Sequence, residues 1–156
     1  MSSDHDPSRP RGITVVNHAL IRREPEAVFD FLTDLEREPD WNAKLLEVVP
    51  LTGGPPRSGS AYDVRFPWPV GRSRIVYESL DRPHLWRTRS TARWLGVRFT
   101  GAIAQADSGS DVTLTTVLLP RGPLRLLGPV LGRTMRSSWD GHLRTIKDTL
   151  ESADPR

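Results

Sequence analysis

The segment at residues 129–151 predicts one long amphipathic helix, and this helix constrains the fold more than any other feature. At about 100° per residue its apolar side chains fall within roughly a third of the circumference. They are Leu131, Met135, Trp139, His142, Leu143, Ile146 and Leu150. The opposite side carries Arg133, Arg136, Asp140, Arg144, Lys147 and Glu151. Gly128 and Pro129 mark the start, because proline suits the first helical position. His142 therefore points toward whatever this helix covers.

The 156 residues of the chain have room for one domain with a sizeable core. We expect the polar residues 1–12 to be a disordered tail and residues 13–152 to form the domain. No apolar run approaches the roughly 20 residues that cross a bilayer, and the N-terminus lacks the apolar region of a signal peptide. The chain has no cysteine, which excludes disulfides, a thiol nucleophile and thiolate metal ligands. We therefore expect a cytoplasmic protein without stable membrane insertion.

Residues that precede the long helix predict mainly short strands joined by tight turns, which is typical of an antiparallel sheet. The predicted strands span residues 13–21, 45–51, 60–66, 72–80, 84–91, 95–105 and 111–119. Two short helices follow the first strand, and proline with acidic neighbours marks the start of each. The first begins at Glu24-Pro25-Glu26, and the second begins at Glu38-Pro39-Asp40 and carries Trp41 and Asn42.

Arginines assign the two faces of the predicted sheet. Alternate residues of a strand point to opposite sides, so each arginine places its neighbours on the other face. The outward arginines are Arg65, Arg72, Arg74, Arg87, Arg89 and Arg98. The inner face then receives Tyr62, Val64, Phe66, Ile75, Tyr77, Trp86, Thr88, Val97, Phe99, Gly101 and Ile103. The alternation is too weak to orient Asn17 and His18. The predicted class is α+β, a curved antiparallel sheet wrapped around the long C-terminal helix.

Several short motifs accompany this order of elements, and they cover nearly the whole chain. They are Pro25-Glu26-Ala27-Val28-Phe29, Pro39-Asp40-Trp41-Asn42, Gly59-Ser60-Ala61-Tyr62, Asp81-Arg82-Pro83, Pro120-Arg121-Gly122 and the closing residues 143–150. Together they resemble the SRPBCC or START-like superfamily with its helix-grip fold, and more narrowly the bacterial polyketide cyclase/dehydrase family. The resemblance implies an internal cavity for an apolar or aromatic small molecule. It does not imply chemistry, because such families include both aromatase/cyclases and proteins that only bind ligands.

The candidate ligand-binding residues come from the inner sheet face, the second short helix and the long helix. They are Trp41, Tyr62, Phe66, Tyr77, Trp86, Phe99, Met135, Trp139 and His142. His142 can act as an acid or base near neutral pH or orient a ligand hydroxyl. Alternatively it is a core histidine bonded to a backbone carbonyl or to Tyr77. The hydroxyl of Tyr77 or Tyr62 can donate to a substrate carbonyl, or it can be satisfied internally.

Trp68 lies in a proline-rich connection between two predicted strands. With Leu124, Leu126 and Leu127 it predicts an apolar entrance to the cavity. The alternatives are a connection folded back on the domain and a dimer contact, so a homodimer stays open.

Three function classes follow from these observations. The leading hypothesis is binding of a lipid-like or polyketide-like small molecule without chemistry. The second is a polyketide aromatase/cyclase or dehydratase that uses His142 with Tyr77 as catalytic residues. The third is an interaction module that uses the outer arginine face. The sequence predicts no cofactor, no metal site and no nucleic-acid partner, because the four histidines lack ligand spacing and no phosphate-binding or nucleic-acid motif is present.

Overall fold

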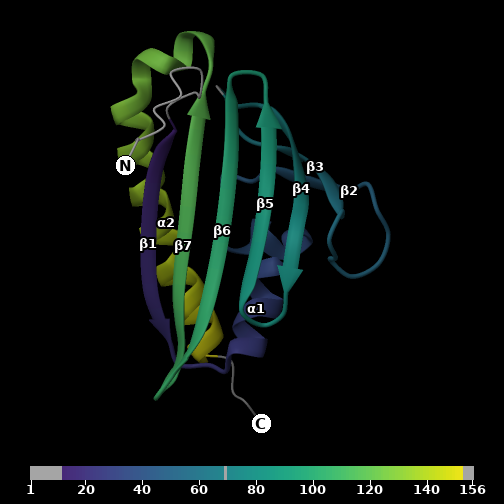
Figure 1. Ribbon diagram of the computed structural model, residues 1–156, viewed down its shortest axis with the longest axis vertical. Coiled ribbons are helices and arrows are strands. Elements are labelled where there is room, and N and C mark those ends of the chain that lie inside the picture. Colours follow the sequence, from purple (N-terminus) through teal and green to yellow (C-terminus); the bar gives the residue numbers. More distant parts are fainter. Residues whose placement is uncertain (1–11, 69, 153–156) are drawn as a thin grey trace, which may run out of the picture.

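Seven antiparallel strands, two α-helices and two 3₁₀ helices make up the part of the chain that the computed structural model describes, residues 12–68 and 70–152 (Figure 1). In chain order they are β1 (Ile13–Ile21), α1 (Pro25–Thr33), η1 (Leu35–Asp40), β2 (Glu47–Pro50), β3 (Ala61–Arg65), β4 (Arg72–Asp81), β5 (Leu85–Ala92), β6 (Leu95–Ala106), β7 (Gly109–Pro120), η2 (Gly122–Leu127) and α2 (Gly128–Ser152). The predicted disordered tail, except Gly12, lies outside the described residues.

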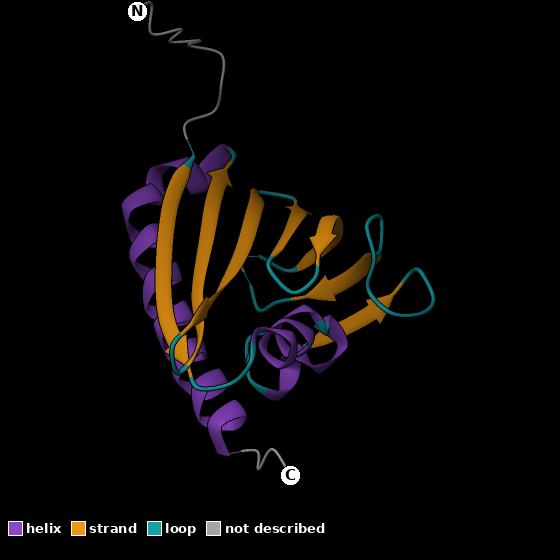
Figure 2. Ribbon diagram, turned by 60° about the horizontal axis from the view of Figure 1, so that its bottom comes forward, coloured by secondary structure: helices purple, strands orange, loops and turns teal. Residues whose placement is uncertain are grey.

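All the strands belong to one sheet in the order β1-β7-β6-β5-β4-β3-β2, so the first strand pairs with the last. Figure 2 shows the strands arranged in an arc, with α2 along the side of β1 and β7. The short helices α1 and η1 lie on the inner side of the arc, where α1 contacts β6 and β7 and η1 contacts β2. The predicted α+β class, with a curved antiparallel sheet and a long terminal helix, is confirmed.

Two local predictions need correction. The second short helix does not begin at Glu38; η1 ends at Asp40, and Trp41 and Asn42 follow it. The helix starts earlier because Leu35 is buried in the core directly after α1, and the amide of Trp41 closes its last turn on the carbonyl of Glu38 at 3.0 Å. The 3₁₀ helix η2, immediately before α2, was also not predicted.

The predicted faces of the sheet are confirmed. The six outward arginines are all exposed, whereas Tyr62, Tyr77 and Trp86 are buried on the inner face. Gly101 explains how the large Trp86 ring fits there. A Cβ at Gly101 would lie 2.2 Å from this ring, so the absence of a side chain lets the indole lie directly on β6.

The structure also orients β1. Asn17 is buried and faces α2, where its Nδ2 donates to the backbone oxygen of Arg136 at 3.1 Å and to Oδ1 of Asp140 at 2.8 Å. His18 points outward beside Asp111. Asp140, which the helical pattern places on the polar side of α2, thus helps to hold the helix against the sheet edge.

Candidate functional site

A cavity of about 430 Å³ lies between the inner face of the sheet, the segment that follows η1, and α2. Most of its walls are aromatic or aliphatic. Several lining residues carry polar side chains, and they come from these elements and from η1 itself; they are Glu38, Asn42, Lys44, Ser73, Tyr77, Thr88, Ser90, Thr116, Thr134, Ser138 and His142, together with the indoles. Such a wall, mostly apolar with a few polar groups, suits a small organic molecule.

The structure brings most of the predicted site residues together around this cavity. Those that line it are Trp41, Phe66, Tyr77, Trp86, Phe99, Met135, Trp139 and His142. Tyr62 is not among the lining residues; it is buried behind them, with its ring edge-on to Tyr77 at 5.9 Å between centroids. Whether these side chains contact a ligand remains a prediction.

Aromatic rings form a connected wall across the cavity. Trp139 of α2 stacks on Phe99 of β6, with centroids 5.1 Å apart, and tilts toward Trp41 at 5.9 Å. Phe99 in turn lies 6.2 Å from Trp86. Such contacts stabilise the wall beyond the area they bury, and they hold flat surfaces in place without a ligand.

His142 is half-buried on this wall. Its ring meets Trp41 and Trp139 edge-on, at centroid distances of 5.7 and 5.5 Å. Burial lowers the pKa of His142 below 6.5, and the nearby charge of Lys44 lowers it further. Neither ring nitrogen of His142 has a hydrogen-bond partner within residues 12–68 and 70–152. The lowered pKa favours the neutral form of the imidazole, and His142 is not the core histidine bonded to a backbone carbonyl or to Tyr77.

Glu38 is a cavity residue that sequence reasoning missed. The sequence pattern predicts Glu38 as the start of a helix, whereas in the structure it lies within η1, three residues after Leu35, and lines the cavity. Its Oε1 accepts a hydrogen bond from Nδ2 of Asn42 at 2.9 Å. Burial of the carboxyl group raises the pKa of Glu38 to about 7, an effect that the Asn42 bond only partly offsets. The i,i+4 spacing of Glu38 and Asn42 was the one available signal, and it does not reveal burial.

The Tyr77 hydroxyl is satisfied internally. It donates to the backbone oxygen of Thr33 at 2.7 Å. Burial, followed by the charge of Glu38, raises the pKa of Tyr77 far above 10. The hydroxyl proton of Tyr77 is therefore engaged in the hydrogen bond to Thr33, although the ring lines the cavity.

The predicted entrance is partly wrong. Trp68 does line the cavity and is 92% exposed, so the cavity reaches solvent beside it. Leu124, however, is buried against Leu95 and Leu118, because η2 turns its side chain inward. Leu126 and Leu127 are exposed but are not among the residues that line the cavity.

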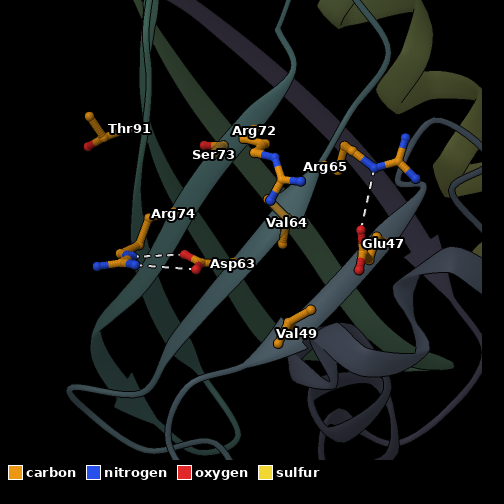
Figure 3. A pocket seen from close by; sticks show the side chains of 9 residues that line it. All are labelled: Glu47, Val49, Asp63, Val64, Arg65, Arg72, Ser73, Arg74 and Thr91. Carbon is orange, nitrogen blue, oxygen red and sulfur yellow. Dashed lines mark hydrogen bonds and ion pairs between the residues drawn. The ribbon is translucent and has the colours of Figure 1, made fainter.

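The outer face of β2, β3 and β4 carries a shallow depression of about 460 Å³ (Figure 3). Two of its three arginines are paired with acids: Arg74 Nε donates to Asp63 Oδ1 at 2.8 Å, and Arg65 lies 3.4 Å from Glu47. Exposed pairs of this kind contribute little to stability. They interrupt the positive charge that an arginine-based interaction module would need on this face.

Two kinds of feature are absent from the described part of the chain. No group of three or more histidine, aspartate or glutamate side chains is arranged to hold a metal ion. No helix there is long and apolar enough to cross a membrane.

A curved antiparallel sheet, a long terminal helix and a cavity between them define the helix-grip, or START-like, class of proteins. The sequence profile of the family described as "Polyketide cyclase / dehydrase and lipid transport" matches residues 12–151, and the chain belongs to this family. No curated protein matches the chain.

Solved structures share this fold at low sequence identity. One is the di-domain ARO/CYC StfQ from the steffimycin biosynthetic pathway, with a TM-score of 0.76 and 14% identity over 94% of this chain and 53% of that one. The protein TTHA0849 from Thermus thermophilus has a TM-score of 0.73 and 16% identity over 91% of this chain and 99% of that one. A START superfamily protein from Mycobacterium smegmatis has a TM-score of 0.71 and 12% identity over 90% and 99%. At these identities the likeness concerns the fold alone.

Proposed function

We propose that this protein binds an apolar or aromatic small molecule, lipid-like or polyketide-like, in the cavity between the sheet and α2. The observation that supports the proposal is the cavity of about 430 Å³, which is lined mainly by aromatic and aliphatic side chains. An apolar ligand that leaves water for such a site gains about 25 cal/mol for each Å² of apolar surface that it buries. Membership of a family described by polyketide chemistry and lipid transport supports the same ligand class.

The test uses N-phenyl-1-naphthylamine, a neutral apolar dye whose fluorescence rises in apolar surroundings. We expect saturable binding to the native protein. Thr88→Phe places a ring into the cavity from β5 and should weaken binding about ten-fold or more, since overpacking costs about 1–3 kcal/mol. Thr91→Phe adds the same ring to the exposed outer face of β5 and is the control. Equal binding by both variants would contradict the proposal. Native mass spectrometry of the purified protein would identify any ligand that co-purifies.

A second candidate is a polyketide cyclase or dehydratase. It is favoured by one observation: a neutral imidazole, His142, and a carboxyl with a pKa of about 7, Glu38, both line the cavity. An acid–base group is most effective when its pKa lies near the working pH. In this candidate His142 takes a proton beside a carbonyl, and ring closure or loss of water follows. Glu38 replaces Tyr77 as the proton donor, because the Tyr77 hydroxyl donates to Thr33.

Turnover distinguishes the two candidates. If the chain only binds, His142→Gln should preserve the fold and change ligand affinity modestly, and the native protein should not convert an aromatic polyketide analogue. Turnover by the native protein that disappears in His142→Gln, with unchanged ligand affinity, would establish the enzyme instead.

A further inference from the structure

One end of the molecule presents large apolar side chains to solvent beside the cavity mouth. Trp68, in the connection from β3 to β4, is 92% exposed, and Leu126 in η2 is 87% exposed. Val130 and Leu127, at the junction of η2 and α2, are 58% and 48% exposed. Single exposed apolar residues are ordinary, but a group of them at one place marks an interaction surface.

Contacts between the elements place these side chains at the same end. Val70, two residues after Trp68, packs against the buried cluster that contains Leu124 of η2. Val130 precedes the cavity-lining Thr134 by one helical turn, so both lie on the same side of α2. The exposed apolar group therefore meets the cavity lining at Trp68 and lies one helical turn from it at Thr134.

The turn between β5 and β6 adjoins the same region. The backbone N–H of Arg121 donates to the oxygen of Trp94 at 2.8 Å, and a Cβ at Gly122 would lie 2.7 Å from the Trp94 ring. Figure 1 shows this turn, the end of β7 and the start of α2 at one end of the sheet. We call the surface made by Trp68, Leu126, Leu127, Val130 and the neighbouring arginines the apical surface.

The charged side chains of the apical surface are all positive. Its arginines are all exposed; they are Arg93, Arg121, Arg125 and Arg133. The segments that build it, residues 67–68, 70–71, 92–95 and 120–134, contain no aspartate or glutamate. Within the described residues none of these four arginines forms an ion pair with a carboxylate. This arrangement differs from the outer face of β3 and β4, where Arg65 and Arg74 form ion pairs with acids.

We propose that the apical surface docks on a bilayer that contains anionic lipids. Tryptophan favours the boundary between headgroups and acyl chains, and leucine and valine side chains bury into it. Each arginine near the surface adds electrostatic attraction to anionic headgroups. The docking is peripheral: side chains of a loop and of helix ends enter the interface, while the sheet stays outside the bilayer.

A second copy of the chain suits this surface less well. A two-fold contact would bring the same patch of both molecules together and so place eight arginines, four from each copy, in one interface. Like charges that face each other oppose association. An anionic bilayer supplies both the apolar medium and the opposite charge.

The docking has a consequence that rests on the proposed function. Since Trp68 belongs both to the apical surface and to the cavity lining, a docked molecule would open its cavity onto the bilayer. The cavity could then take up or release an apolar ligand without exposing it to water.

The test is co-sedimentation with vesicles of phosphatidylcholine alone and of phosphatidylcholine mixed with phosphatidylglycerol. The native protein should bind the anionic vesicles more tightly, and added salt should weaken the binding. Arg125→Gln with Arg133→Gln should weaken it about five-fold for each arginine removed. Arg87→Gln with Arg89→Gln removes the same charge from the outer face of β5 and should leave it nearly unchanged. Trp68→Ser should weaken binding while the salt dependence remains.

Three results would overturn the docking proposal: no binding to anionic vesicles, equal loss in both arginine pairs, or a solution dimer that Trp68→Ser dissociates without any vesicle binding. The proposed function is tested separately, because Arg125 and Arg133 do not line the cavity. The Arg125→Gln, Arg133→Gln protein should bind N-phenyl-1-naphthylamine as the native protein does. Dye binding without vesicle binding refutes docking alone, and vesicle binding without dye binding refutes the cavity ligand alone.

Discussion

Replacing Glu38 by glutamine should make the protein more stable at alkaline pH than the native chain. The pKa of Glu38 is about 7 in the folded protein and 4.5 in an unperturbed side chain. Between these two values the unfolded state has released its proton while the folded state still holds it. The free energy of unfolding of the native protein therefore falls as pH rises from about 4.5 to about 7, and the full cost is present above pH 7.

The size of this effect follows from the pKa difference. Each pKa unit corresponds to about 1.36 kcal/mol, so a change from 4.5 to about 7 amounts to about 3 kcal/mol. Glutamine keeps a side-chain oxygen to accept the bond from Asn42 but has no proton to lose. Relative to the native protein, Glu38→Gln should gain stability up to about 3 kcal/mol between about pH 5 and about pH 8.

Urea unfolding of the two proteins at several pH values measures this difference directly. The titration of His142 is common to both proteins and cancels in the comparison. Glu36→Gln is the matched control, since Glu36 lies on the same 3₁₀ helix and is exposed. A stability difference that stays constant across this pH range, or that appears equally in Glu36→Gln, would refute the argument that burial holds the Glu38 proton.

Three further predictions test the packing, the outer face and the imidazole. Gly101→Ala should lower the free energy of unfolding by about 1–3 kcal/mol in urea unfolding, because its methyl group would collide with the Trp86 indole. Gly141→Ala, which adds a methyl group in open space on α2, is the control and should be neutral or stabilising. Arg87→Glu with Arg89→Glu should change stability by less than about 1 kcal/mol and leave dye binding intact, since both side chains are exposed on the outer face. An NMR titration should give His142 a pKa below 6.5, and a value above 6.5 would contradict its burial.

The layout of this protein could be predicted from local patterns. The stripe on the last helix and the alternation of arginines with apolar residues are short-range periodicities, and they correctly placed Trp139 toward the sheet and Arg65 and Arg98 away from it. The same logic failed for Asn17, because no charged neighbour sets the phase of β1. Only the pairing of β1 with β7 decided that Asn17 faces α2.

The polar chemistry of the cavity depends on contacts between residues that are distant in sequence. A glutamate followed by a proline can stand at the exposed start of a helix or inside a short helix that packs on the core. The sequence is the same in both cases, so it could not show that the Glu38 carboxyl is buried. The partner of the Tyr77 hydroxyl is a backbone oxygen of α1, 44 residues away. Sequence periodicity determined the sheet, its faces and the terminal helix because each is set by neighbouring residues. The tertiary structure alone decided which polar groups are buried and what they bond, because burial and hydrogen-bond partners arise only when separate elements pack together.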